Sequence, residues 1–301
     1  MNATLWTCPV CSHALERIDK QFRCQQGHGY DIAREGYANL LLAHQRHSAS
    51  PGDDKQMLRN RREFLEQGYY QTLAERLALL VSEDCQQRDI PEYRFLDSGC
   101  GEGYYTGLIA QALDEKCQEK RLQLGGTDIA KDAIRMAAKR YPAIDFAVAS
   151  NTALPVADHS LDCLLRVFAP GSDSEVARVL KAGGLFISVT PGPRHLYALR
   201  ELVYDQPREH AADIPVIEGL SHSQRSQLDF HLQIQGGDIA RLLAMTPYYW
   251  QASEEKQAHI AALASLDTEV SFQVDLYRRA AIPASEEPAE DGWARFQKKP
   301  G

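Results

Sequence analysis

The sequence lacks the features that would place the protein in or across a membrane. It contains no run of eighteen apolar residues, about the length that a membrane-spanning helix needs. Its first residues, MNATLW, lack the basic and then apolar regions of a secretory signal. It shows no internal repeat. We therefore expect a cytoplasmic protein with no membrane partner.

The sequence also lacks an overall excess of positive charge. A net charge of −8 argues against a uniformly basic nucleic-acid binder. Residues 1–62 nevertheless hold nine Lys or Arg against six Asp or Glu, so a local basic face could steer a polyanion toward one end of the molecule. A solvated charged surface explains the same pattern equally well.

Cysteine is scarce and unevenly placed, since three of the seven cysteines fall within the first 24 residues. Together with a histidine they form the pattern Cys8-x2-Cys11-x12-Cys24-x3-His28. Thiolates and imidazole are the ligands that zinc prefers, and a closed set of four leaves no open position for catalysis. The pattern predicts a structural zinc ion, with His13 as a rival fourth ligand and buried free cysteines as the alternative.

The chain divides into segments of different character. Residues 1–36 are too short for a core of their own and would fold around the metal. We expect a linker over 37–52, a main α/β domain over 53–281 and a disordered tail over 282–301, where proline and acidic residues accumulate.

The main domain alternates β-rich runs with helical stretches, which predicts βαβ units and a mostly parallel sheet. Helices are expected over 132–140 and 194–204. Two later runs, 228–234 and 269–277, could pair antiparallel at the sheet edge. The other expected strands are 93–97, 122–127, 144–149, 161–168 and 184–190.

A glycine turn follows the first of these strands. Gly99, Gly101 and Gly103 allow a tight turn and the close approach of a nucleotide. Asp97, two residues before the turn, could face a cationic ligand group, which favours S-adenosylmethionine over NAD. Asp128, at the end of the next strand, is placed to accept hydrogen bonds from ribose hydroxyls.

These features predict an α/β fold of the class I S-adenosylmethionine-dependent methyltransferase type, Rossmann-like with a mostly parallel sheet and preceded by a small N-terminal zinc-binding module. The turn at 180–184, leading into an apolar strand, resembles the entry to the fifth strand of such enzymes. A doubly wound domain that binds another nucleotide is the alternative.

Nearly the whole chain resembles one family, the bacterial 23S ribosomal RNA (guanine-N1)-methyltransferases, which modify a guanine in hairpin 35 of the large-subunit RNA. No single match is decisive, but their order is specific. Besides the zinc pattern, the matching segments are 27–31, 34–41, 51–53, 97–106, 138–142, 168–170, 190–196 and 245–247 with Trp250.

The resemblance implies a homodimer whose cleft accepts an RNA hairpin. Of the two branches, which methylate neighbouring guanines, the chain looks less like the one linked to macrolide or tylosin resistance. It departs from the family at Gly171, where Cys is expected, and at Ser98. The residues implied around S-adenosylmethionine are Tyr70, Asp97, Gly99, Tyr105, Thr106, Asp128 and His195.

The segment Phe168, Ala169 and Pro170 follows the fourth expected strand, where class I enzymes present the methyl acceptor. Phe168 could stack on the base, and its alternative is core packing. His195 could contact the cofactor or act as a base, or be an ordinary loop histidine. Tyr70 could cover the cofactor or simply pack.

A basic stretch precedes the main domain. Asp53 or Asp54 should cap a helix here, and an exposed helix face explains its charge as well as RNA contact does. Phosphate contacts depend on cationic side chains, and the candidates are Arg46, Lys55, Arg59, Arg61 and Arg62.

The leading hypothesis is therefore methyl transfer to guanine N1 in 23S rRNA. The alternatives are a small-molecule methyltransferase with a zinc-stabilised lid, a non-catalytic cofactor-dependent RNA-binding protein, and an NAD-dependent oxidoreductase, which the glycine spacing disfavours.

Overall fold

The computed structural model describes residues 3–45, 52 and 54–280. The predicted tail, 282–301, and Arg46 lie outside the described residues. A small antiparallel sheet at the N-terminus has the order β1-β2-β3-β4. Its strands are β1 (Ala3–Thr7), β2 (Ala14–Ile18), β3 (Gln21–Arg23) and β4 (Gly29–Asp31).

The main sheet has eight strands in the order β11-β12-β10-β9-β6-β7-β8-β5. The pairs from β10 to β5 are parallel, while β12 pairs antiparallel with both β10 and β11. The mostly parallel sheet and the antiparallel edge pair are thus confirmed. The strands are β5 (Ala38–Asn39), β6 (Glu92–Ser98), β7 (Arg121–Asp128), β8 (Asp145–Val148), β9 (Leu161–Val167), β10 (Leu180–Pro191), β11 (Leu220–Gln235) and β12 (Ser265–Arg279).

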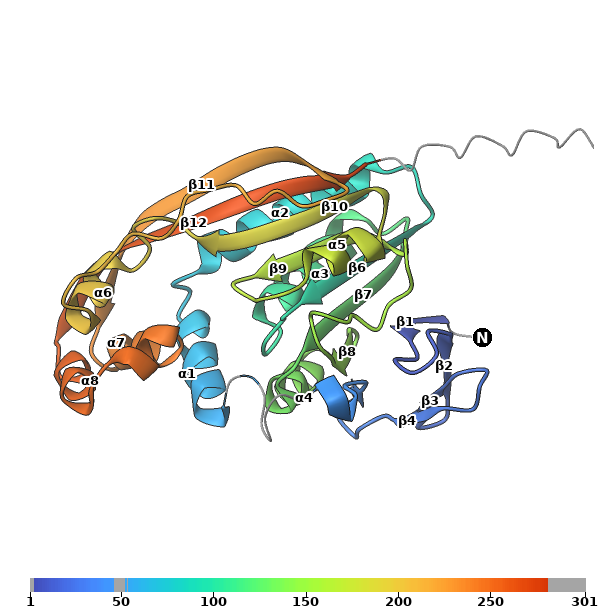
Figure 1. The fold of residues 1–301 in the computed structure, drawn as a ribbon, viewed down its shortest axis with the longest axis horizontal. Coiled ribbons are helices and arrows are strands. Elements are labelled where there is room, and N and C mark those ends of the chain that lie inside the picture. Colours follow the sequence, from blue (N-terminus) through green and yellow to red (C-terminus); the bar gives the residue numbers. More distant parts are fainter. Residues whose placement is uncertain (1–2, 46–51, 53, 281–301) are drawn as a thin grey trace, which may run out of the picture.

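Helices cover the main sheet and extend beyond one of its ends. In Figure 1, α6, α7 and α8 lie at the end of the molecule toward which the arrows of β9 and β10 point. None of the helices in the described part of the chain is long and apolar enough to cross a membrane. The helices are α1 (Lys55–Glu66), α2 (Gln71–Gln87), α3 (Tyr104–Lys116), α4 (Lys131–Arg140), α5 (Asp173–Val179), α6 (Tyr197–Val203), α7 (Gly237–Ala244) and α8 (Glu254–Ala261), with short 3-10 helices η1 (Ala43–Gln45) and η2 (Pro247–Gln251).

Local sequence explains where α1 begins. The Asp54 carboxylate accepts hydrogen bonds from the backbone N–H groups of Gln56 and Met57 at 2.7 and 2.9 Å, as an N-cap does. Helix α4 matches its predicted range closely, whereas α6 begins three residues later than the predicted 194.

The start of the predicted linker is part of the sheet. Residues Ala38–Asn39 form β5, which pairs in parallel with β8. Tyr37, Leu40 and Leu41 are buried, since their apolar side chains fill this edge of the core. Residues 37–41 are therefore structured, and the boundary between the two domains remains a prediction.

The small sheet packs on the main domain rather than standing alone. Trp6 is 1% exposed and shares a hydrophobic cluster with Leu96 and Ala147 of the main sheet. The Thr7 N–H donates to the carbonyl of Pro155 at 2.7 Å. A change in the small sheet on loss of a bound metal would therefore also affect the main domain, through the contacts of β1.

Candidate active site and metal centre

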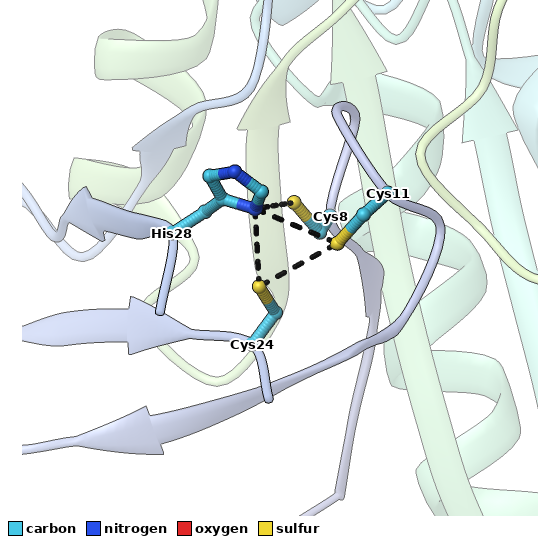
Figure 2. A group of neighbouring side chains, drawn as sticks. All are labelled: Cys8, Cys11, Cys24 and His28. Carbon is cyan, nitrogen blue, oxygen red and sulfur yellow. Dashed lines mark hydrogen bonds between the residues drawn. The ribbon is translucent and has the colours of Figure 1, made fainter. Parts of the chain in front are cut away.

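Four ligands of the kind that zinc prefers converge in the small sheet. The Sγ atoms of Cys8, Cys11 and Cys24 lie 3.5, 3.5 and 3.4 Å from Nδ1 of His28, and those of Cys11 and Cys24 are 3.6 Å apart (Figure 2). A tetrahedral zinc with Zn–S of about 2.3 Å and Zn–N of about 2.0 Å needs neighbouring ligand atoms about 3.5–3.8 Å apart. The four ligand atoms therefore fit a structural zinc ion.

The neighbours of the ligand set support this assignment. The Tyr30 hydroxyl lies 3.1 Å from Cys8 Sγ, where it can donate a hydrogen bond to the thiolate of the metal-bound form. His13 is exposed, and its Nδ1 lies 2.9 Å from the carbonyl oxygen of Cys11. His13 thus stands outside the ligand set.

The glycine turn connects β6 to α3 in a conformation that glycine favours. Gly99, Gly101 and Gly103 have φ angles of 82°, 56° and 85°, in the left-handed region where a Cβ is strained. A Cβ on Gly99 would lie 2.3 Å from the Ala169 Cβ and 3.0 Å from the Asn151 Nδ2. The turn therefore packs directly against the loop that follows β9.

Two carboxylates lie at the ends of the neighbouring strands β6 and β7. Asp97 is 1% exposed and accepts a hydrogen bond from the Thr106 hydroxyl at 2.6 Å. Burial raises the pKa of Asp97 to about 7, the Thr106 bond opposes that rise, and the charge of Asp128 adds to it. Asp128 accepts hydrogen bonds from the N–H groups of Gly101 and Ala130 at 2.9 and 2.8 Å. An ammonium group such as that of S-adenosylmethionine, bound next to Asp97, would stabilise the ionised form of this buried carboxylate.

Phe168 occupies a strained position where β9 ends. Its φ is 52°, which costs an aromatic residue roughly 1–3 kcal/mol unless its surroundings hold it there. Its N–H donates to the Val189 carbonyl at 3.0 Å, yet its side chain is 41% exposed. The ring packs against Phe272, with centroids 5.6 Å apart, so core packing covers only part of Phe168. The exposed part of the ring lies at the carboxyl end of β9, a central strand, next to Ala169, which packs on the glycine turn.

His195 lies beside this ring as a buried, neutral imidazole. The centroids of the His195 and Phe168 rings are 5.9 Å apart. His195 Nδ1 accepts a hydrogen bond from the Ser271 N–H at 3.3 Å, which leaves Nε2 to carry the proton. Burial, followed by the charge of His210, lowers the pKa of His195 to about 3. In this arrangement Nε2 is placed to donate a hydrogen bond, and the role of His195 as a base stays a prediction.

The two predicted cofactor tyrosines are largely buried. Tyr70 is 2% exposed and packs its ring edge-on to Phe272 at 4.9 Å, while its centroid lies 6.3 Å from that of His195. It is thus a core residue that also borders the site. Tyr105 lies on α3 just past the glycine turn, and burial raises its pKa well above the ordinary value.

The predicted phosphate contacts separate into two groups. Lys55 and Arg59 are exposed on α1, with the Lys55 ammonium 3.8 Å from Asp132. Arg62 instead lies 3.2 Å from the buried carboxylate of Glu102, and Arg61 lies 3.5 Å from the Met245 carbonyl. Arg61 and Arg62 thus have partners within the protein, and their role as phosphate contacts stays a prediction.

Asn151 is a site residue that the sequence did not reveal. Its Nδ2 donates to the Pro170 carbonyl at 3.1 Å, while its Oδ1 is buried without a hydrogen-bond partner. No motif marks it, because its position beside Gly99 and Pro170 arises only when β8 folds next to the glycine turn.

The departure at Gly171 coincides with a filled space. A Cβ at this position would lie 2.8 Å from Arg166 Nη1. Arg166 is fixed there, since its guanidinium lies 3.2 Å from Asp173 and 5.0 Å from the ring centroid of Phe186. A cysteine at 171 would require Arg166 to move. Ser98, the other departure, is buried at the end of β6.

Comparisons with known proteins agree with both parts of the site. A family model described as "RlmA, N-terminal", a zinc ribbon, matches residues 6–49, and a methyltransferase-domain model matches 95–184. The chain is 32% identical to the 23S rRNA (guanine(748)-N(1))-methyltransferase of Streptomyces fradiae, over 89% of this chain and 93% of that protein.

Two further relatives are provisionally named as 23S rRNA (guanine-N(1)-)-methyltransferases. The protein of Micromonospora griseorubida is 32% identical over 85% of this chain and 90% of its own length. The YxjB protein of Bacillus subtilis is 28% identical over 91% and 97%. The chain therefore belongs to the 23S rRNA (guanine-N1)-methyltransferase family and combines an N-terminal zinc ribbon with a class I S-adenosylmethionine-dependent methyltransferase domain.

Proposed function

We propose that the protein transfers a methyl group from S-adenosylmethionine to N1 of a guanine in the hairpin 35 loop of 23S rRNA. The observation that carries this proposal is the position of Phe168. Its strained, half-exposed ring stands at the end of β9, and the next residue, Ala169, packs on the cofactor turn at Gly99. A planar base that stacks on this ring would be held beside the glycine turn.

The cofactor-binding part of the site is formed by adjacent strand ends. When bound, S-adenosylmethionine supplies the methyl group as an electrophile. Asp97 would receive its ammonium group and Asp128 its ribose hydroxyls, while Gly99 allows close approach of the backbone. Tyr105 and Thr106, on α3 just past the glycine turn, would close this side of the site.

The base must lose its N1 proton before N1 can act as a nucleophile. Loss of this proton leaves negative charge on O6 of guanine, and a hydrogen-bond donor at O6 would stabilise that charge. The Nε2–H of His195 is suited to this role, because Nδ1 is occupied by Ser271. The proton itself passes to solvent.

The loop after β9 would orient the base edge. Carbonyl oxygens of 168–170 can accept hydrogen bonds from N1–H and from the exocyclic amino group of guanine. Asn151 holds this loop through the Pro170 carbonyl, so we assign it a positioning role. Orientation of the acceptor atom is the main requirement of methyl transfer.

The test is transfer of labelled methyl groups to large-subunit RNA that lacks this modification, followed by mapping of reverse-transcription stops. Methylation at N1 blocks Watson–Crick pairing and should give a single stop in the hairpin 35 loop. Asp97→Asn is the control with impaired cofactor binding. Transfer of labelled methyl groups to a small-molecule acceptor, with none in RNA, would favour the small-molecule alternative. Cofactor binding without transfer to any acceptor would favour a non-catalytic RNA-binding protein.

The same experiment identifies the guanine, which we expect to be the neighbour of the one methylated by the macrolide-resistance branch. Two further parts of the proposal are a homodimer, to be measured by sedimentation equilibrium, and a cytoplasmic location, where ribosomal RNA is made. Lys55 and Arg59 remain the proposed phosphate contacts on α1. Replacing both by Gln should flatten the salt dependence of RNA binding.

A further inference from the structure

Arg200 is a buried cation in the middle of α6. It is 6% exposed, and its Nε and Nη1 atoms are buried without a hydrogen-bond partner. The ring centroids of Tyr197 and Tyr248 lie 5.9 and 6.0 Å from its guanidinium carbon. At such distances aromatic rings offset only a small part of the cost of burying a charge.

In the described part of the chain, the polar side chains that surround Arg200 are imidazoles and a tyrosine hydroxyl, which carry no negative charge. His210 Nε2 lies 3.1 Å from the Tyr248 hydroxyl oxygen, and His195 is the other imidazole of this cluster. Burial lowers the pKa of both imidazoles, and the positive charge of Arg200 acts in the same direction. The cluster of Arg200, His210, Tyr248 and His195 therefore combines hydrogen-bond donors with positive potential, which suits an anionic ligand.

The sheet order places this cluster on the acceptor side of the site. Asp97 ends β6, Phe168 follows β9, and His195 follows β10, which are successive neighbours in the sheet. Arg200 lies on α6, which packs on β12, and β12 is separated from β6 by β10 and β9. An anion bound by Arg200 would therefore lie next to the stacked base rather than next to the cofactor.

We propose that Arg200 binds a phosphate of the RNA strand beside the methylated guanine, which rests on the proposed function. A guanidinium fork matches phosphate geometry, and the ligand would supply the missing countercharge. Residues 204–219, which form no helix or strand, would shift to admit the strand, carrying His210 with them. The phosphate would then hold the backbone while Phe168 and His195 hold the base.

The first test compares Arg200→Gln and Arg200→Lys with Arg208→Gln, which removes an exposed arginine from the neighbouring 204–219 segment. We expect Arg200→Gln to raise the KM for the hairpin RNA at least tenfold, with kcat and cofactor affinity little changed. In this variant, the slope of the logarithm of the RNA-binding constant against the logarithm of the salt concentration should become shallower by about 1. Arg200→Lys should be intermediate because it keeps the charge without the fork, and Arg208→Gln should resemble the wild type. Weaker cofactor binding with unchanged RNA binding would overturn the proposal and assign Arg200 to the cofactor carboxylate.

A second test locates the phosphate. A single uncharged methylphosphonate next to the target guanine should weaken wild-type binding as much as Arg200→Gln does. The two changes should not be additive, because they remove the same contact. Additive losses at every phosphate beside this guanine would contradict the proposal.

A third test does not depend on methyl transfer. Inorganic phosphate, at constant ionic strength, should raise the melting temperature of the wild type more than that of Arg200→Gln. Arg200→Met should melt above the wild type without phosphate, since it removes an uncompensated buried charge. If Arg200→Met melts lower and the phosphate effect survives in Arg200→Gln, Arg200 is a packing residue and the inference is wrong. If the phosphate effect requires Arg200 but the wild type does not methylate RNA, the anion site stands and the proposed function fails.

Discussion

The guanidinium of Arg62 lies 3.2 Å from the carboxylate of Glu102, a residue of the glycine turn that is 1% exposed. Arg140 lies 3.9 Å from the same carboxylate. Burial raises the pKa of Glu102, while the charges of Arg62 and Arg140 oppose that rise. The pair links α1 to the glycine turn, so a residue of the basic stretch stabilises this turn.

Arg62→Met should destabilise the protein by about 3 kcal/mol, because it leaves a buried carboxylate with a weaker partner. The double variant Arg62→Met with Glu102→Gln should recover most of that loss, since neither charge of this ion pair is then left without the other. Urea unfolding of both variants measures the difference. If Arg62→Met has unchanged stability but a weaker salt dependence of RNA binding, Arg62 contacts an RNA phosphate instead.

Asp97 should make the stability of the cofactor-free protein fall as pH rises from about 4 to about 7. Its folded pKa, about 7, exceeds the ordinary 3.8, so in this range the folded state holds a proton that the unfolded state has released. The free energy of unfolding then decreases by up to about 1.4 kcal/mol per pH unit. Asp97→Asn should abolish this slope in pH-dependent unfolding, whereas Asp114→Asn, at an exposed position of α3, should keep it.

Cofactor binding should depend on the same group with the opposite sign. An ammonium group binds the ionised carboxylate of Asp97, so binding below pH 7 should release a proton and cofactor affinity should rise toward pH 8. Calorimetry in two buffers of different ionisation enthalpy measures this proton. Equal affinity at pH 6 and pH 8 would show that Asp97 does not meet the cofactor's cation.

Zinc binding should depend on His28 and not on His13. His28→Ala should lose the metal, since it removes one of four ligands, while His13→Ala should bind one zinc per chain as the wild type does. Elemental analysis gives the content. Because Trp6 packs on the main domain, metal loss should also lower the melting temperature of that domain. A zinc-free His13→Ala protein would reverse the assignment.

His195→Gln should keep more turnover than His195→Ala, because the glutamine amide can donate from near the Nε2 position. Because burial lowers the pKa of His195 to about 3, we expect no titration of this imidazole in the rate near neutral pH. The pH profile of kcat/KM should therefore have the same limbs in His195→Gln as in the wild type. A limb that disappears with the imidazole would identify it as the base.

Gly99→Ala should reduce activity far more than Gly183→Ala. Both positions have a positive φ, so both substitutions carry a backbone cost of about 1–2 kcal/mol. Only at Gly99 would the new Cβ also meet Ala169, whereas no heavy atom lies within 4 Å of a Cβ at Gly183. Measuring the free energy of unfolding and kcat for both variants separates the effect of backbone strain from that of displacing the loop 168–170. Equal losses in both variants would show that strain alone matters.

Several features of this protein could be derived from local sequence. The zinc ligands are revealed by spacing, because Cys8, Cys11, Cys24 and His28 are held by short turns whose geometry is local. The strands of the parallel sheet other than β5 are revealed by apolar runs, because strands that are buried on both faces are rich in apolar residues. The glycine turn is revealed in the same way, since positive φ angles restrict the residue type at each position.

The remaining features were decided by contacts between distant segments. Arg59 and Arg62 lie on one helix and look alike in sequence, but only Arg62 meets the buried Glu102. Asn151 and Arg200 carry no motif, because their roles depend on what the fold places around them. Local sequence thus determined the zinc ligand set, the strands of the main sheet other than β5 and the glycine turn, since short-range geometry governs all three. Tertiary structure alone decided which charges are buried and which nitrogen of His195 is free, because burial and hydrogen-bond partners come from chain segments far apart in the sequence.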